Sequence, residues 1–212
     1  MYDLCVGLGY HCESTYQLRR HTGDERARFF DWLDLDFGSV VDTIRGDFQD
    51  VLRTGPVVPF SDGRCALDRP SNIRFFHDFH AEPGRPLAPP DIHRQLPRVR
   101  EKFTYLAERW RAMTASSAHV LYVHHDAFDE IGASDVLRLR AVLAAQHPDH
   151  RFGLLWLRRT PPPDADGLPP GVRWDTVPLV EGRWEGDDLA WDRVLSALPL
   201  RRRATPAAKS RA

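Results

Sequence analysis

The amino-acid sequence predicts a single α/β domain with a three-layer arrangement, a mostly parallel central sheet and a loop-rich insertion in the first half. Short apolar segments alternate with amphipathic segments in the second half, as the crossovers between parallel strands require. A length of 212 residues suits one domain with a full hydrophobic core. Prolines crowd residues 54–90, which indicates loops and short strands there. We therefore expect one domain over residues 1–198 and a disordered tail over 199–212.

The first elements are a strand and a helix separated by a glycine turn. Residues 3–9 are short, apolar and closed by glycine, which is typical of a buried strand that enters a tight turn. Residues 11–20 are compatible with a helix that stops near Gly23. The aromatic stretch 29–33 is too short for a helix and indicates a buried loop or strand.

A second helix and an isolated strand follow. Apolar residues recur at helical spacing over 40–52, and Ser39 is the expected cap of this helix. Within the proline-rich part, residues 73–79 form the best strand candidate.

The second half of the chain is more regular. A long amphipathic helix is expected over 91–114. The elements expected after it are strands and helices in alternation, at residues 119–124, 135–146, 152–157, 172–177 and 187–198.

The composition limits the classes of function. The 29 basic and 30 acidic residues give a net charge of −1, which argues against a nucleic-acid binder that works by bulk positive field. A mean hydropathy of −0.45 and the lack of a long apolar run argue against a membrane partner. No signal peptide is visible after Met1, so a cytoplasmic location is expected. The three cysteines are too few, and odd in number, for a disulfide framework.

The cysteines differ in their expected settings. Cys12 follows a strand and a glycine turn and opens a helix, where free N–H groups and a partial positive charge favour a thiolate. Cys5 lies within a strand and Cys65 within a strand-like segment between loops, so both are expected to be packing residues. Cys12 is therefore the candidate nucleophile.

Nucleotide and metal cofactors are not expected. The spacing Gly7-x-Gly9-x-x-Cys12 imitates a dinucleotide fingerprint, but its third glycine is replaced and no acidic residue ends a second strand. His77 and His80 form a loose pair, without the spacings that are usual for metal ligands.

Two histidine clusters follow predicted strands. His77-Asp78 ends the 73–79 strand, and His124-His125-Asp126 follows the 119–124 strand, where the carboxyl ends of parallel strands form ligand crevices. A cysteine nucleophile needs an imidazole within hydrogen-bond reach. Spacing along the chain leaves open whether Cys12 meets His77, and taken alone His77 is interpreted as a partly buried, satisfied histidine.

Several short motifs, in this order, resemble a bacterial family identified as papain-like cysteine peptidases. The family has a Leu-Gly-x-x-Cys opening, a Leu-Arg-Arg helix, a Phe-Asp-Trp segment and a later His-Asp-Phe. The matching segments of this chain lie at residues 8–12, 18–20, 30–32 and 77–79, with further similarity at 99–103, 120–123 and 184–191. The resemblance spans residues 3 to 197.

The resemblance implies a Cys12 nucleophile, a His77 partner and a thioester intermediate on a peptide or a small acyl or amide substrate. A third residue would orient the imidazole, and Asp78, Asp31 and Asp126 are the alternatives. Asp78 is a poor orienter of His77, because neighbours on a strand point to opposite faces. We expect the catalytic set to come from Cys12, His77, Asp78 and Asp31.

Two alternatives stay open. A cysteine directly after the first strand of a three-layer α/β domain also resembles SGNH-type esterases and related acyltransferases of polysaccharide pathways. The chain can also be a non-catalytic protein whose Cys12 turn and His77 line a pocket for a small molecule or peptide. In either case we expect four aromatic residues in the core, namely Phe30, Trp32, Trp184 and Trp191.

Overall fold

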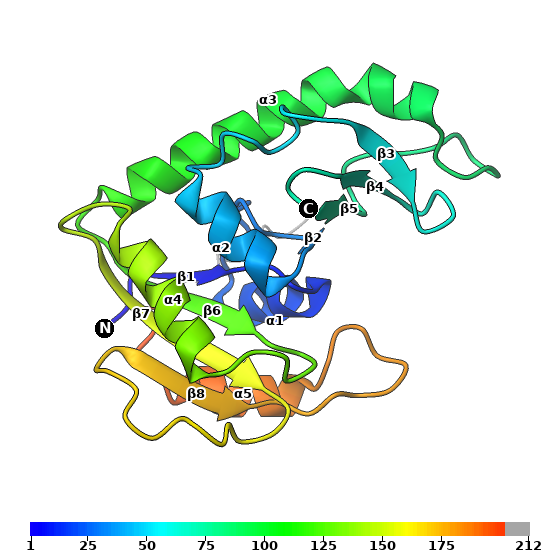
Figure 1. Cartoon of the computed structure of the whole chain (residues 1–212). Coiled ribbons are helices and arrows are strands. Elements are labelled where there is room, and N and C mark those ends of the chain that lie inside the picture. The colour runs from blue at the N-terminus through cyan, green and yellow to red at the C-terminus, as the bar shows by residue number, and fades with distance from the viewer. Residues whose placement is uncertain (202–212) are drawn as a thin grey trace, which may run out of the picture.

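A four-stranded parallel sheet forms the centre of the computed structural model, which describes residues 1–201 (Figure 1). Its strand order is β1-β6-β7-β8. The strands span Leu4–Gly7, His119–His125, Arg151–Arg158 and Val172–Thr176, in that order. All neighbours run parallel, so the predicted α/β fold class is confirmed.

The proline-rich insertion folds into a second, antiparallel sheet with the order β2-β5-β4-β3. Its strands are β2 (Leu33–Asp34), β3 (Val57–Phe60), β4 (Cys65–Asp68) and β5 (Ile73–Phe75). The strand expected over 73–79 is too long, since β5 ends at Phe75, where its pairing with Leu33 and Ala66 also ends. His77 therefore lies in the bend after the strand.

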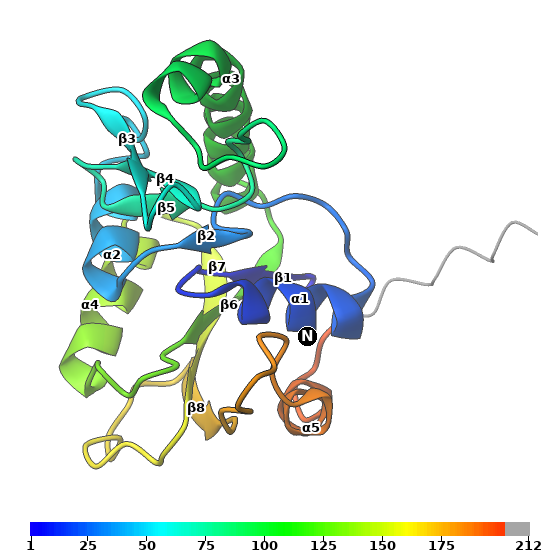
Figure 2. The ribbon, with the colours of Figure 1, turned by 90° about the vertical axis from the view of Figure 1, so that its right-hand side faces the viewer.

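Helices cover both faces of the parallel sheet (Figure 2). They are α1 (Cys12–Thr22), α2 (Phe37–Arg45), α3 (Pro89–Thr114), α4 (Ala133–Ala144) and α5 (Asp188–Ser196). On one side, Leu18 of α1 and Trp191 of α5 pack against Leu121 of β6. On the other side, α3, α4 and the antiparallel sheet share one core with the parallel strands, which gives the expected layers.

The start and end of α2 differ from the prediction. Asp36, not Ser39, caps the helix, because its Oδ1 accepts the Ser39 N–H at 2.7 Å. The helix ends at Arg45 instead of residue 52, and Asp47 and Phe48 have φ of 49° and 62°, values that a helix does not accommodate. The apolar spacing over 40–52 reflects burial, which continues through Phe48 and Leu52 after the helix has ended.

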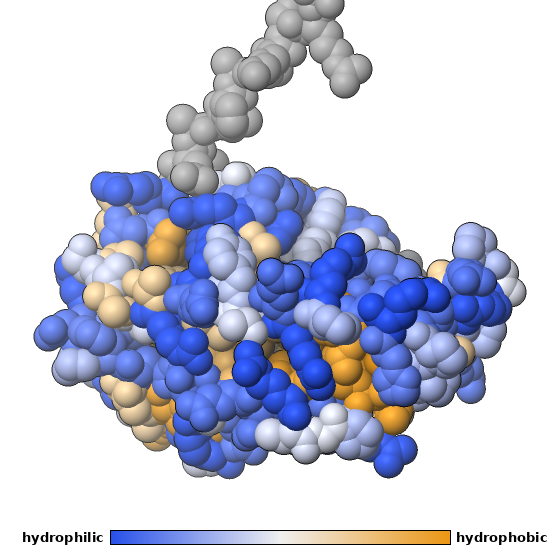
Figure 3. Space-filling model, turned by 90° about the horizontal axis from the view of Figure 1, so that it is seen from above, coloured by the Kyte–Doolittle hydropathy of each residue, from blue (hydrophilic) through white to orange (hydrophobic). Residues whose placement is uncertain are grey.

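The last described residues run beside the N-terminus. The Tyr2 N–H donates to the Pro199 carbonyl at 2.7 Å, and the Arg201 N–H donates to the Tyr2 carbonyl at 2.9 Å. The remainder of the predicted tail, 202–212, lies outside the described residues. Seen from the α3 side, the surface is mostly hydrophilic, with apolar colour in hollows between polar side chains (Figure 3). None of the helices in the described part of the chain is long and apolar enough to cross a membrane.

Candidate functional site

A strained turn brings Cys12 to the first position of α1. The chain leaves β1 when the Leu8 N–H donates to the Val123 carbonyl at 2.9 Å, and Gly9 and Tyr10 then take φ of 76° and 86°. A non-glycine residue rarely adopts such a φ, and the surrounding structure must hold it there. The Tyr10 hydroxyl does so by donating to Glu130 Oε2 at 2.6 Å. Cys12 follows at the amino end of the helix, as predicted.

The structure brings Cys12 and His77 together. Cys12 Sγ lies 3.5 Å from His77 Nε2, within hydrogen-bond reach of a sulfur donor. The His77 ring packs edge-on against Trp32, with 5.6 Å between the ring centroids. Because Cys12 belongs to the parallel-sheet layer and His77 to the loop after β5, this contact joins the two sheets at one point.

The Cys12 thiol is not held as a resting thiolate. Burial raises its pKa above the ordinary value of 9.0, and the nearby Asp34 carboxylate raises it further, while the backbone N–H of Cys12 lowers it. The helix start alone predicts the opposite shift. The buried thiol of Cys5 has a pKa raised to about 12 by burial, and burial also raises the pKa of the Cys65 thiol.

The carboxylates expected near His77 have other partners. Asp78 is buried and accepts a short hydrogen bond from Lys102 Nζ of α3, so it fixes the loop that carries His77. Asp126 accepts the N–H groups of Glu130 and Ile131 at 2.8 and 3.2 Å, and thus shapes the loop after β6. Within residues 1–201, the contact with Cys12 is the one hydrogen bond of the His77 ring.

Asp31 reaches the site through two other side chains. Its carboxylate accepts Arg19 Nη2 at 2.7 Å, and the Arg19 guanidinium lies 5.6 Å from the centre of the Trp32 ring. Trp32 in turn contacts His77. The Phe-Asp-Trp segment therefore supports the position of His77 without an Asp31–His77 bond.

The predicted crevice residues His124 and His125 are fully enclosed. Their exposed fractions are 1% and 2%, and burial lowers their pKa values to about 4 and about 3. His124 packs against Phe37 and Tyr10, under the Cys12 turn. Both rings thus stay neutral near pH 7; His124 supports the turn, whereas His125 packs against Trp191 of α5.

A cavity of about 590 Å³ opens over Cys12 and His77. Its walls are mainly apolar and come from the residues that flank β2 and β5, from the loops after β6 and β7, and from the loop between β8 and α5. The wall residues include Trp32, Phe76, Phe128, Arg159, Leu179 and Trp184. Ligands bind at the carboxyl ends of parallel strands, so the loops after β6 and β7 are expected to line the site. The sequence analysis named only His124–Asp126 of these loops and missed Phe128 and Arg159.

The outcome for the four aromatic residues is mixed. Phe30 and Trp191 are in the core, with exposed fractions of 1% and 0%. Trp184 is 56% exposed and lines the cavity, so the prediction of a core position is wrong for this residue. Trp184 sits in a loop, where no apolar periodicity demands burial. Trp32 lines the cavity as well, and it packs edge-on against His77.

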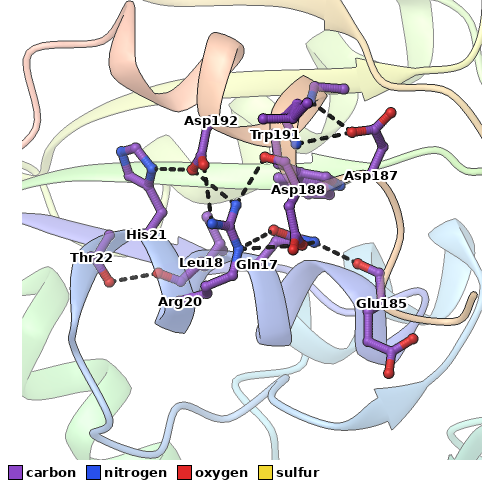
Figure 4. A network of polar contacts seen from close by, with 12 residues as sticks. Gln17, Leu18, Arg20, His21, Thr22, Glu185, Asp187, Asp188, Trp191 and Asp192 are labelled. Carbon is purple, nitrogen blue, oxygen red and sulfur yellow. Dashed lines mark hydrogen bonds and ion pairs between the residues drawn. The ribbon is translucent and has the colours of Figure 1, made fainter.

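Polar contacts between α1 and α5 hold the loop that carries Trp184 (Figure 4). Gln17 Nε2 donates to the Glu185 carbonyl at 2.6 Å and to Asp188 Oδ1 at 2.7 Å. Arg20 Nη2 pairs with Asp192 Oδ1 at 2.8 Å. The residue after Cys12 joins this network, because Glu13 Oε1 accepts Trp191 Nε1 at 2.8 Å.

No group of three or more His, Cys, Asp or Glu side chains within residues 1–201 is arranged to hold a metal ion. Comparisons with family models, with curated proteins and with solved structures gave no match to this chain. The resemblance to papain-like cysteine peptidases therefore stays a prediction.

Proposed function

We propose that the protein is a cysteine acyl-transfer enzyme, a peptidase or amidase, in which Cys12 is the nucleophile and His77 the base. The observation that carries this proposal is the 3.5 Å contact between Cys12 Sγ and His77 Nε2 in the lining of the cavity. Nucleophile and base within hydrogen-bond reach are the minimum constellation for covalent catalysis by a thiol.

The raised pKa of the Cys12 thiol favours His77 as a general base over His77 as the imidazolium partner of a resting thiolate. Since the resting thiol keeps its proton, His77 takes that proton as sulfur attacks the acyl carbon, and a resting thiolate–imidazolium pair is disfavoured. The S–C bond forms, the bond to the amine leaving group breaks, and His77 returns the proton to the amine. Water then adds to the thioester with His77 as base, and the Cys12 thiol is regenerated.

The turn before α1 supplies the groups that stabilise the oxyanion. The first N–H groups of a helix have no partners within the helix, and Cys12 occupies the first position of α1. The N–H of Cys12 lies close enough to lower the pKa of the thiol, and such groups can donate to an oxyanion that develops on the attacked carbonyl. The strained Gly9–Tyr10 turn thus determines both the place of the sulfur and the direction of these donors.

Acyl transfer to an amine or alcohol, as in an SGNH-like acyltransferase, uses the same two residues. It differs in the group that resolves the thioester. A non-catalytic binding protein would use the same cavity without forming a covalent bond. These alternatives are outcomes of the experiment below.

The test uses p-nitrophenyl hexanoate, an activated ester with an apolar acyl chain. We expect release of p-nitrophenolate and a hexanoyl adduct on Cys12 in the intact mass spectrum. His77→Ala lowers the acylation rate by about 10²-fold or more, the usual contribution of a positioned base. Cys12→Ala abolishes the adduct.

His80→Ala is the matched control, since His80 is an exposed histidine three residues away, whose backbone bonds to Gln95. It retains the wild-type rate. The partition of the acyl group between water and an added amine separates a hydrolase from an acyltransferase. Equal rates for wild type, Cys12→Ala and His77→Ala would identify a binding protein and end the proposal.

A further inference from the structure

One cation in the cavity wall, Arg159, forms no ion pair with a carboxylate of the described residues. Arg159 follows β7, and its backbone N–H donates to Asp129 Oδ1 at 2.9 Å. Its guanidinium lies 4.7 Å from the centre of the Phe128 ring, and Nη2 is buried without a hydrogen-bond partner. No carboxylate within residues 1–201 pairs with this side chain. A buried guanidinium nitrogen that makes no hydrogen bond is unfavourable until an acceptor arrives.

The acidic side chains of the same cavity are already engaged. Asp34 Oδ1 accepts Arg74 Nη1 at 2.9 Å. Glu13 accepts Trp191 Nε1, and burial raises the pKa of its carboxyl, while the charge of Arg159 acts on it in the opposite direction without forming an ion pair. The second arginine of the wall, Arg183, is half exposed and has Asp188 Oδ2 at 3.7 Å. Arg159 is therefore the wall residue whose charge is left for a ligand.

We propose that Arg159 binds an oxyanion of the substrate, a carboxylate or a phosphate carried on an apolar stem. The inference rests on the proposed function in one respect, that the reacting centre is Cys12. It adds the substrate class: acyl compounds that are apolar between the scissile group and the anion. A guanidinium fork donates two parallel hydrogen bonds to such a group and fixes its orientation.

The layout of the cavity sets the position of the anion. The Phe128 ring lies between Arg159 and His11, at 5.4 Å from the His11 ring and 4.7 Å from the guanidinium. His11 is the residue before Cys12, whereas His77 and Trp32 stand on the side of the antiparallel sheet. The anion thus binds at Arg159, on the parallel-sheet side of Cys12 Sγ, with the Phe128 ring between the two. The apolar stem of the substrate lies along the aromatic side chains of the cavity.

The experiment compares how fast matched maleimides alkylate Cys12. One probe is 6-maleimidohexanoate, with a carboxylate on a five-carbon stem, and the other is its uncharged primary amide. We expect wild-type protein to react at least about tenfold faster with the carboxylate, because a hydrogen bond to a charged group is worth that much. Arg159→Gln removes this preference and leaves the rate with the amide unchanged.

Arg151→Gln is the control, since it removes the same charge from the exposed opposite end of β7 and retains the preference. Protection of Cys12 by hexanoate or by inorganic phosphate distinguishes a carboxylate site from a phosphate site. Equal rates for the two maleimides in wild type, or a preference that only Arg183→Gln removes, would overturn the role of Arg159. The proposed function fails on a separate readout, the ester acylation that depends on His77.

Discussion

Buried imidazoles beneath the Cys12 turn make the stability of the protein sensitive to acid. The pKa of His124 is lowered from 6.5 to about 4 because burial disfavours the charged ring, and neither ring nitrogen has a hydrogen-bond partner among the described residues. The pKa of His124 is lower in the folded state than in the unfolded state, where it is about 6.5. The contribution of the neutral ring to the free energy of unfolding is therefore complete above pH 6.5. The contribution is lost as the pH falls from 6.5 toward 4, and its full size is about 3 kcal/mol.

The variant His124→Leu removes this loss. We expect its free energy of unfolding, measured by urea titration, to fall less than that of wild type between pH 6.5 and 4. His93→Leu, on the exposed face of α3, follows the wild-type pH dependence. Parallel curves for all three proteins would show that His124 does not titrate in this window and would contradict the assignment.

At the scale of single residues, the sequence predicted the two side chains that meet in the site, Cys12 and His77, but not their surroundings. A cysteine at a helix start is a local pattern, so Cys12 could be selected from its position, whereas His77 was selected through the resemblance to papain-like cysteine peptidases. The sign of the Cys12 pKa shift depends on burial and on Asp34, which lies on a strand of the other sheet. The partners of Asp78 and Asp31 are similarly distant, and Lys102 and Arg19 have no spacing that marks them.

Among the elements, the turn between β1 and α1 is the most constrained. A Cβ on Gly9 would overlap Leu35 Cδ2, and Leu35 is 1% exposed and has no room to move. Gly23, at the other end of α1, has a similar φ of 67°, but no atom of the other described residues lies within 4 Å of a Cβ built there. Alanine at Gly23 would therefore cost backbone strain alone, whereas alanine at Gly9 would cost backbone strain and steric overlap with Leu35.

Alanine at these positions gives unequal losses. Gly23→Ala is expected to lower the free energy of unfolding by roughly 1–2 kcal/mol, the cost of a left-handed alanine. Gly9→Ala loses at least about 1 kcal/mol more, because the overlap adds to the strain. It also slows alkylation of Cys12 by iodoacetamide, while Gly23→Ala does not. If Gly9→Ala and Gly23→Ala lowered the free energy of unfolding equally, the Leu35 side chain would have moved to make room. The turn would then not be fixed by steric contact.

The helices α1–α5 and the four parallel strands were predicted from the sequence, but boundaries were wrong where burial continues past the end of an element. The segment after α2 is buried through Phe48 and Leu52 in a non-helical conformation, so its apolar spacing imitated a longer helix. The small antiparallel sheet had weak signals, since β2 has two residues and β5 three. Such short strands are defined by their partners and not by their own alternation.

For the whole molecule, the site depends on the docking of two sheets. Cys12 comes from the layer of the parallel sheet and His77 from the antiparallel sheet, and one core of buried side chains joins the two. Val6 of β1, Phe75 of β5, Phe103 of α3 and Trp156 of β7 all belong to this core. A parallel sheet was predicted from the alternation of elements. Its contact with the insertion was not, because the core that joins them pairs residues far apart in the chain.

A shared core makes unfolding of the site and of the fold one event. We expect the urea transitions monitored by far-ultraviolet circular dichroism, by tryptophan fluorescence and by loss of protection of buried Cys65 to coincide. Cys65 reports the antiparallel sheet, while Trp156 and Trp191 lie against the parallel sheet. If Cys65 became reactive at lower urea than the other two signals, the insertion would unfold on its own. His77 would then leave Cys12 while the parallel sheet stayed folded, and the reaction with p-nitrophenyl hexanoate would disappear with the first transition.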